Sequence, residues 1–280
     1  MKIRVGVQIV PQHTTWDEFE KAILAVDQGG FDTLFTWDHF YPLYGQPGDP
    51  MHPPDAPALD LPHLGDHFEC YTLLSAMAVL TKKVEFGALV TCNTYRNPQL
   101  LADMARTIDH ISRGRFILGI GSGWFERDYQ EYGYEFGTAG ERLKKLDANM
   151  PIITERLKKL TPPPVRQPMP IMIGGGGEKV TLRIVAQQAD IWNGYGTPDE
   201  MRHKNAVLDE WCAKVGRDPQ KIERSMIVDS RAFSALSDDQ ARAQLDAFLQ
   251  AGVTHFIYSV QTPFQLEDAQ RILRWREAKA

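Results

Sequence analysis

Hydrophobic and polar positions alternate along this chain in two repeating patterns. Short apolar runs are followed by longer segments in which apolar residues recur every three or four positions, as an amphipathic helix requires. The apolar runs predict strands over Ile3–Val10, Thr33–Trp37, Val84–Val90, Phe116–Gly121, Ile171–Gly174, Asp190–Gly194, Ile222–Asp229 and Thr254–Ser259. The longer segments predict helices over 16–28, 69–80, 98–111, 140–160, 178–189, 198–215, 237–250 and 263–277.

Eight units of a strand followed by a helix fit within the 280 residues of the chain. This number of units favours a closed parallel barrel in the α/β class, the (β/α)8 TIM barrel. An open doubly wound sheet is the alternative, but it usually has roughly five to seven strands and would leave some units unplaced. No shift in composition and no flexible linker divides the chain, so we expect a single domain over 1–280.

In a barrel of this kind, the residues that follow each strand converge on the carboxyl-terminal mouth. The segments after the predicted strands are polar, aromatic and rich in glycine, which predicts a ligand site at this mouth. These segments are Gln12–His13, Asp38–His39, Thr91–Arg96, Gly121–Trp124, Gly174–Gly177, Asn193–Tyr195, Asp229–Arg231 and Ser259–Gln261.

The overall composition narrows the classes of function. Hydrophobic content of 43% and charged content of 24% are typical of a soluble globular protein. No apolar run approaches the ~18 residues that a membrane span needs, and MKIRVGVQIV lacks the cleavage site of a signal peptide. A net charge of -5 argues against nucleic acid or an anionic membrane as partner. Three cysteines without CxxC spacing indicate free thiols in a reducing cytoplasm.

Four consecutive glycines, Gly174–Gly177, stand between the fifth predicted strand and the next helix. A backbone without Cβ can approach an anion closely, and the amides at a helix start carry partial positive charge. The run therefore predicts a phosphate site, although it lacks the ending of a Walker A loop and the spacing of a nicotinamide-binding turn. The shorter GSG after the fourth strand, Gly121–Gly123, is compatible with a second close approach to a ligand or with a tight turn.

The sequence FTWDHFYP places Asp38 and His39 at the end of the second predicted strand. Histidine titrates near neutrality and transfers a proton in either direction, and a neighbouring carboxylate can orient its ring. We therefore predict that His39 is a catalytic proton carrier aided by Asp38. His13 is a second candidate for such a role. The three histidines between positions 52 and 67 match no familiar spacing of metal ligands, so no metal site is expected.

A long proline-rich insertion follows the second predicted strand. Seven prolines lie between Pro42 and Pro62. Loops of this length inside compact domains are commonly lids or binding elements, and proline lowers the entropy lost when a segment is ordered. We expect the insertion, over 42–66, to cover the mouth as a lid, and the alternative is a variable surface excursion.

Four ordered motifs resemble those of the bacterial luciferase-like superfamily. They are DHF after strand two, TYRNP after strand three, GRFILGIGSGWFERDYQEYGYEF through strand four and IGGGGEKVTLRIVAQQADIWNGYGTPDEM from strand five. More narrowly, they are similar to the actinobacterial branch of oxidoreductases that depend on the deazaflavin coenzyme F420. The resemblance covers nearly the whole chain and implies a barrel that binds a deazaflavin or flavin at its mouth.

The resemblance also implies roles for individual residues. Gly174, Gly175, Gly176 and Gly177 would hold the phosphate of the cofactor, while Asp38 and His39 would lie beside its redox ring. A cis peptide between Leu89 and Val90, in the segment that ends with Thr91, would support that ring. The remaining positions that we expect to contact the cofactor are Gly121, Ser122, Gly123 and Asn193.

One residue departs from the pattern of relatives that oxidise sugar phosphates. Those relatives carry a glutamate acid where this chain has Trp124, and tryptophan cannot donate that proton. A hydrophobic or aromatic small molecule is therefore the expected substrate. The residues that we expect to line the substrate pocket are His13, Trp37, Tyr95, Trp124 and Tyr195.

Three hypotheses of function follow. The first is an F420-dependent oxidoreductase that transfers a hydride between the deazaflavin and a small molecule, because the barrel positions the reactants and the cofactor supplies the chemistry. The second is an FMN-dependent monooxygenase that receives reduced FMN from a reductase. The third is a non-catalytic protein that binds a flavin or deazaflavin. Family membership also implies a homodimer.

Overall fold

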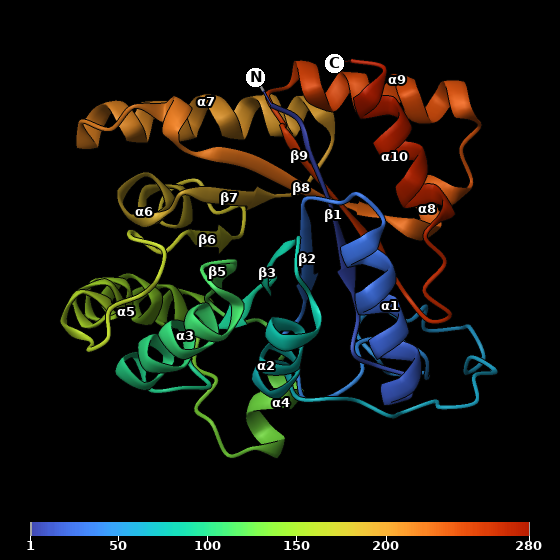
Figure 1. Ribbon diagram of the computed structural model, residues 1–280, viewed down its shortest axis with the longest axis horizontal. Helices are drawn as coiled ribbons and strands as arrows, with labels where there is room; N and C mark the ends of the chain where they lie inside the picture. Colours follow the sequence, from blue (N-terminus) through green and yellow to red (C-terminus); the bar gives the residue numbers. More distant parts are fainter. Residues whose placement is uncertain (1, 280) are drawn as a thin grey trace.

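Parallel strands form one closed sheet at the centre of the computed structural model, which describes residues 2–279. The strand order is β3-β2-β1-β9-β8-β7-β6-β5-β4, and β3 also pairs with β5 (Figure 1). The strands are β1 (Arg4–Ile9), β2 (Thr33–Thr36), β3 (Glu85–Ala88), β4 (Thr91–Cys92), β5 (Phe116–Gly121), β6 (Ile171–Gly174), β7 (Ile191–Gly194), β8 (Glu223–Asp229) and β9 (His255–Val260).

Helices surround this sheet on the outside, as Figure 1 shows. They are α1 (Trp16–Gln28), α2 (Cys70–Leu80), α3 (Pro98–Ser112), α4 (Glu126–Glu131), α5 (Ala139–Lys159), α6 (Thr181–Gln188), α7 (Pro198–Val215), α8 (Ser230–Ser234), α9 (Asp238–Gln250), α10 (Glu267–Glu277) and the 3-10 helix η1 (Pro219–Lys221). Because β3 and β4 both pair with β5, they occupy one position of the barrel, which leaves eight positions. The predicted (β/α)8 TIM barrel, with its proline-rich insertion after β2, is confirmed. No helix within residues 2–279 is long and apolar enough to cross a membrane.

Local sequence signals explain where most helices begin. Four of them, α1, α5, α7 and α9, start with a capping box. The side chain of the capping Thr or Ser accepts a hydrogen bond from the amide three residues later, and the Glu or Gln at that later position accepts one from the amide of the capping residue. Helix α3 instead begins at Pro98 behind the cap of Asn97. These signals are readable from the sequence, and the predicted bounds of α1 and α7 are accordingly correct.

Four sequence-based expectations need correction, and the first is the last helix, since α10 begins at Glu267 rather than at Pro263. The predicted third strand, Val84–Val90, is shorter in the structure: β3 ends at Ala88, and the cis peptide Leu89–Val90 separates it from the short β4. The helix after the glycine run begins at Thr181 rather than at Glu178, because residues 178–180 form a turn. The short elements α4, α8 and η1 were not predicted, since six residues or fewer are too short to show a helical period.

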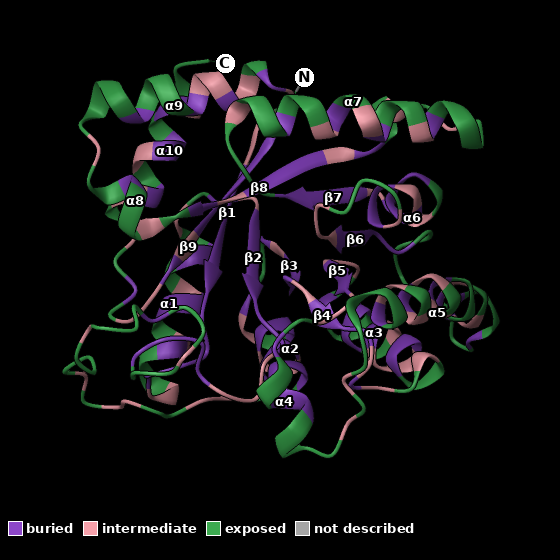
Figure 2. Ribbon diagram, turned by 180° about the vertical axis from the view of Figure 1, so that it is seen from behind, coloured by how far each residue is buried: buried purple, intermediate pink, exposed green. Residues whose placement is uncertain are grey.

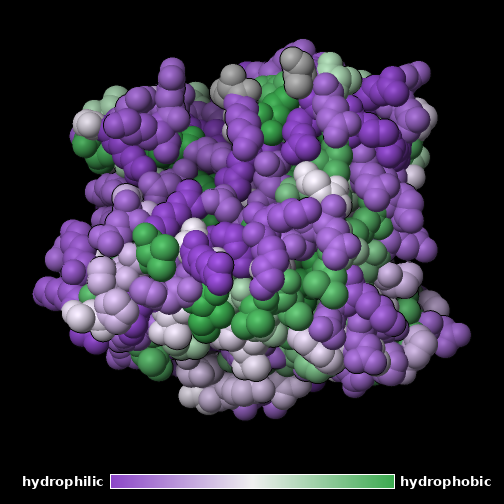
Figure 3. Space-filling model, viewed as in Figure 1, coloured by the Kyte–Doolittle hydropathy of each residue, from purple (hydrophilic) through white to green (hydrophobic). Residues whose placement is uncertain are grey.

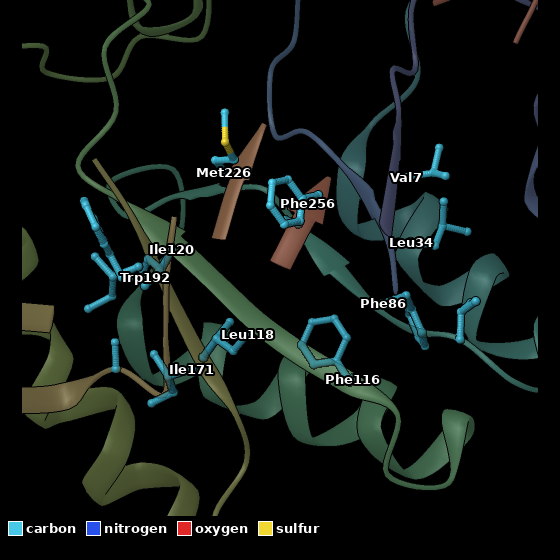
Figure 4. Close-up of a cluster of buried hydrophobic side chains, with 14 of the residues drawn as sticks. Val7, Leu34, Phe86, Phe116, Leu118, Ile120, Ile171, Trp192, Met226 and Phe256 are labelled. Atoms are coloured by element: carbon cyan, nitrogen blue, oxygen red, sulfur yellow. The ribbon is translucent and has the colours of Figure 1, made fainter. Parts of the chain in front are cut away.

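The strand side chains divide into an outer and an inner layer, as alternation along a strand requires. Outward residues pack against the helices, and Figure 4 shows several of them, including Phe86, Leu118 and Phe256. Inward residues form a smaller cluster: Phe35, Leu89, Ile117, Met172, Ile191 and Ile257. Figure 2 shows that the strands are buried while the helices expose their outer faces. The inner cluster fills the barrel, so a ligand can enter only at its ends.

Candidate active site

A cavity of about 450 Å³ opens at the carboxyl ends of the strands. Most of the residues predicted for the cofactor and the substrate line it. These are Trp37, Asp38, His39, Leu89, Val90, Thr91, Tyr95, Gly121, Ser122, Gly123, Trp124, Gly174, Gly175, Asn193 and Tyr195. Cys92, Asp229 and Ser259, from segments expected at the mouth, also line it, together with four residues that were given no role in the site: Gln8, Leu43, Met51 and Ile227.

His39 lies in the cavity wall within a box of aromatic rings. Its ring meets those of Trp37, Trp124 and Phe125 edge to face, with centroids 5.6–5.7 Å apart. Its Nδ1 lies 2.7 Å from Oδ2 of Asp128, and the side chain is only 13% exposed. No hydrogen bond to Nε2 is formed by any residue within 2–279. The imidazole is therefore held at one nitrogen and available at the other.

Asp38 is not the carboxylate that orients His39. Both of its oxygens accept hydrogen bonds from the Arg96 guanidinium, at 2.6 and 3.0 Å, and one also accepts from the Cys92 amide at 2.9 Å. Arg96 in turn donates to Glu69 at 2.7 Å. The prediction that Asp38 aids His39 is therefore wrong, because a bidentate ion pair already occupies its carboxylate.

The carboxylate beside His39 comes from Asp128 on α4. The helix has only six residues, so its sequence shows no period that would have placed this side chain. Asp128 was nevertheless present in the motif GSGWFERDYQEYGYEF, and an acid inside a segment after a barrel strand is a signal that could have selected it. The two residues are 89 positions apart in the chain, so only the fold brings them together.

The segment around the cis peptide forms one wall of the cavity. Leu89–Val90 has the cis form predicted for it. Gln8 supports it, since its Nε2 donates to the Leu89 carbonyl at 3.0 Å, and Ser259 donates to the Gln8 Oε1 at 2.9 Å. The Val90 side chain occupies the space that a Cβ on Gly121 would need, at 2.7 Å. Gly121 is therefore required by the close approach of Val90.

Gly123 has a structural reason of a similar kind. Its φ is +80°, and a Cβ there would lie 2.1 Å from the Tyr129 hydroxyl and 2.6 Å from Cys92 Sγ. The Tyr129 hydroxyl forms hydrogen bonds with Thr94 at 2.6 Å and with Cys92 at 3.1 Å. Of the two interpretations of the GSG segment, the tight turn is the one that these contacts explain.

The four-glycine run forms an open loop after β6. Gly175 has φ of +130°, its amide donates to the Asn193 carbonyl at 3.1 Å, and its carbonyl accepts from Trp192 Nε1 at 2.8 Å. A Cβ on Gly176 would lie 3.0 Å from Lys204 Nζ. Gly176 and Gly177 do not line the cavity itself but continue from its edge, beside the positive charge of Lys204. Such a cradle of bare backbone next to a cation suits an anionic group.

His13 is not part of the substrate pocket. Its Nε2 donates to the Tyr44 carbonyl at 2.5 Å, and its Nδ1 accepts from the Gly65 amide at 3.0 Å. The residue is buried and has φ of +55°. The prediction that His13 contacts substrate is therefore wrong, because both ring nitrogens anchor the two ends of the proline-rich insertion.

The insertion forms a wall of the cavity through Leu43 and Met51. His52 is buried inside it, with Nδ1 accepting from the Gly45 amide at 3.4 Å. At its far end, His67 Nε2 accepts from Trp37 Nε1 at 3.3 Å. Burial lowers the pKa of His67 to about 4, so this ring is neutral near pH 7 and acts as an acceptor.

The amino-acid sequence matches the model of the luciferase-like monooxygenase family over residues 1–279. The chain belongs to this family. Curated relatives of this luciferase-like protein include the pyrimidine monooxygenase RutA of Caulobacter vibrioides, 27% identical over 184 residues. An uncharacterized protein of Mycobacterium tuberculosis is 29% identical over 163 residues. These matches cover 58% and 53% of this chain and 51% and 53% of the relatives, so the chain spans about half the length of the curated relatives it matches.

Solved structures share the fold of this luciferase-like protein. An F420-dependent secondary alcohol dehydrogenase, in complex with an F420-acetone adduct, has a TM-score of 0.77 at 15% identity, covering 96% of this chain and 97% of the other. A type II Baeyer-Villiger monooxygenase component of Pseudomonas putida, in complex with FMN, has a TM-score of 0.68 at 14% identity, covering 99% and 96%. The predicted membership of the luciferase-like superfamily is confirmed, and F420-dependent and FMN-dependent proteins both have this fold.

Proposed function

We propose that this protein is an oxidoreductase that uses the deazaflavin coenzyme F420 to transfer a hydride to or from a hydrophobic small molecule. The observation that carries the proposal is the free Nε2 of His39 in a mostly apolar cavity that leads to the open glycine loop. The fold that this protein shares with an F420-dependent alcohol dehydrogenase supports it.

The residues present fit such a cofactor. The bare backbone from Gly174 to Gly177, with Lys204 beside Gly176, would hold the phosphate, because backbone without Cβ can approach an anion closely. Val90 and the apolar wall around it would contact the flat ring. When bound, the deazaflavin supplies the hydride acceptor or donor, which no side chain of the protein can replace.

His39 would exchange the proton that accompanies the hydride. Three other titratable groups in the cavity wall are already engaged: Asp38 by Arg96, the Tyr95 hydroxyl by Asp128 at 3.0 Å, and Asp229 by the Ala232 amide at 3.0 Å. Cys92 is buried, and burial raises the pKa of its thiol, so it stays protonated. One available imidazole suits a reaction that moves one proton with one hydride.

The shape and polarity of the cavity favour an apolar substrate. Trp37 and Trp124 stand beside the imidazole, and Ile227 and Met51 contribute further apolar surface. Aromatic and aliphatic walls of this kind bind hydrophobic ligands while a few polar atoms fix orientation. We therefore expect a substrate in which an apolar group adjoins the reacting carbon.

Cofactor titration and a substrate screen test the proposal. The purified protein is titrated with oxidised F420 and with FMN while ligand fluorescence is followed, and a panel of apolar alcohols, ketones and enones is then assayed with F420 in either redox state. We expect F420 to bind and at least one class to be turned over. Binding of FMN without binding of F420 would contradict the assignment.

An FMN-dependent monooxygenase is the second candidate. It is favoured by the match to the luciferase-like monooxygenase model and by the FMN-bound structure with the same fold. A flavin reacts with oxygen much faster than a deazaflavin does. Oxygen consumption that depends on reduced FMN and on an added substrate would therefore distinguish this candidate from the first.

We also propose that the protein is a cytoplasmic homodimer. Its three cysteines are buried and free, which fits a reducing compartment. Val79 on α2 and Leu100 and Ile111 on α3 are apolar and 59%, 54% and 44% exposed. Figure 3 shows hydrophobic side chains among polar ones on the face where these helices lie. Light scattering of the wild type and of Leu100→Glu tests whether this face joins two copies.

A further inference from the structure

Three hydrogen-bond donors and the His39 ring surround the carboxylate of Asp128, and its side chain is fully buried. Its Oδ1 accepts from the amides of Phe40 and Tyr41, at 3.0 and 3.1 Å. Its Oδ2 accepts from the Tyr95 hydroxyl at 3.0 Å and lies 2.7 Å from His39 Nδ1. The backbone amides of Phe40 and Tyr41 can only donate, so the carboxylate acts as a hydrogen-bond acceptor at this place.

An ionised carboxylate can only accept hydrogen bonds, so the short contact to His39 requires a proton on Nδ1. In the neutral ring, Nε2 then carries no proton and presents a lone pair to the cavity. The aromatic rings of Trp37, Trp124 and Phe125 restrict how the imidazole can turn. The protonation pattern of His39 is thus determined by Asp128 and not by the ligand.

We propose that Asp128 is a positioning residue, which holds His39 in the tautomer whose Nε2 accepts a proton from the substrate. This proposal rests on the proposed function in one respect only, namely that the proton comes from the substrate. The tautomer itself is a property of the free protein. The two can therefore be tested separately.

Asp128→Asn is the informative variant, because the structure dictates how the new amide must lie. The Phe40 and Tyr41 amides are both donors, so the amide oxygen must replace Oδ1 and face them. The amide nitrogen must then face His39 and donate to Nδ1. This reverses the tautomer and places the proton on Nε2, with almost no change in the size of the side chain.

Tyr95→Phe is the matched control. It removes a donor from the same oxygen of Asp128 while leaving the carboxylate and its contact with His39. We therefore expect Tyr95→Phe to keep the wild-type tautomer. If Asp128→Asn merely loosened the site, the two variants would behave alike.

The first measurement is proton-nitrogen NMR on free protein with ¹⁵N-labelled histidine, at a pH where the imidazole is neutral. His39→Gln assigns the His39 signals among the eight histidines. We expect protonated Nδ1 in the wild type and in Tyr95→Phe, and protonated Nε2 in Asp128→Asn. A wild-type ring protonated on Nε2 overturns the proposal even if Asp128→Asn does not fold. So does a folded Asp128→Asn protein that keeps the wild-type tautomer.

The second measurement is turnover with F420 and a substrate found in the screen. Asp128→Asn should lower kcat by about 10²–10⁴-fold, the usual contribution of a positioned acid or base, with KM and F420 affinity unchanged. A folded variant with wild-type kcat overturns the proposal. If the wild type binds no F420, the proposed function fails, while the NMR result still decides the role of Asp128 in setting the tautomer.

Discussion

The two ends of the barrel both contain cavities lined with charged residues, but they use their charges differently. The cavity at the amino ends of the strands is the larger, at about 830 Å³ against 450 Å³ at the carboxyl ends. At the amino end, Arg4 lies between Glu85 and Glu223, and Arg166 pairs with the other oxygen of Glu85. His255 Nδ1 lies 2.5 Å from Glu223, while its Nε2 contacts the Thr33 hydroxyl at 2.8 Å.

At the carboxyl end, by contrast, a histidine and a backbone loop keep hydrogen-bonding capacity that no group in the described part of the chain uses. His39 has a partner at one nitrogen only, and the glycine loop exposes backbone without side chains. Both nitrogens of His255, by contrast, face protein groups. Cavity size therefore does not identify the site in this protein. The site is identified instead by groups that the fold holds in place but leaves with unused hydrogen-bonding capacity. These groups lie at the carboxyl ends of the strands, where TIM barrels have their active sites.

The largest effect is expected from replacing one histidine at each end. His39→Gln should lower turnover by about 10²–10⁴-fold, because it removes the proton carrier. His255→Gln should leave the turnover of the folded protein unchanged and lower its melting temperature. Steady-state kinetics and thermal unfolding of both variants check this. Equal loss of turnover in the two variants would remove the distinction between the ends.

The second effect concerns the ion pairs at the amino end. Arg4→Met removes the partner that Glu85 and Glu223 share and leaves each carboxylate with only one, Arg166 for Glu85 and His255 for Glu223. Breaking a largely buried network in this way should lower the free energy of unfolding by about 3 kcal/mol. Urea unfolding measures this change, and F420 titration serves as the control. Weakened cofactor affinity in the folded variant would show that this end also supports the site.

The third prediction concerns acid stability. Burial raises the pKa of Glu223, but His255 and Arg4 lower it more, to about 2. A carboxyl group whose pKa is lower in the folded protein stabilises it above the ordinary pKa of about 4.5, and this stabilisation is lost as pH falls toward 2. We expect a loss of about 2–3 kcal/mol over that range. Unfolding curves at several pH values should show a smaller loss for Glu223→Gln, and an equal loss would contradict the assignment.

The smallest effect is expected at the glycine loop. A Cβ on Gly176 would meet only the flexible end of Lys204 and the Tyr195 ring, so Gly176→Ala should fold normally. It should weaken binding of a phosphate-bearing flavin roughly tenfold, as expected when one hydrogen bond to a charged group is disturbed. Fluorescence titration with FMN and with riboflavin separates the phosphate from the ring. An equal loss of affinity for both ligands would place the phosphate elsewhere.

Much of the fold followed from local patterns in the sequence. Strands β5 and β6 have the predicted bounds, because short apolar runs between turns mark buried strands. Helix α7 also has them, because the proline, its capping box and the glycine that ends it are all local signals. The resemblance to a known family, rather than any pattern of hydrophobicity, located the cis peptide at Leu89–Val90.

The sequence by itself determined the number of strand-helix units, the place of His39 after the second strand and the glycine run at the end of β6, since the positions of strands and their ends follow from local patterns. Only the tertiary structure decided the partners. In the folded protein Asp38 pairs with Arg96, 58 positions away, and His13 forms hydrogen bonds with the insertion. Asp128 contacts His39. Hydrogen bonds of this kind depend on distances of a few tenths of an ångström between segments far apart in the chain. No local pattern encodes such distances, because they arise only when the whole barrel closes.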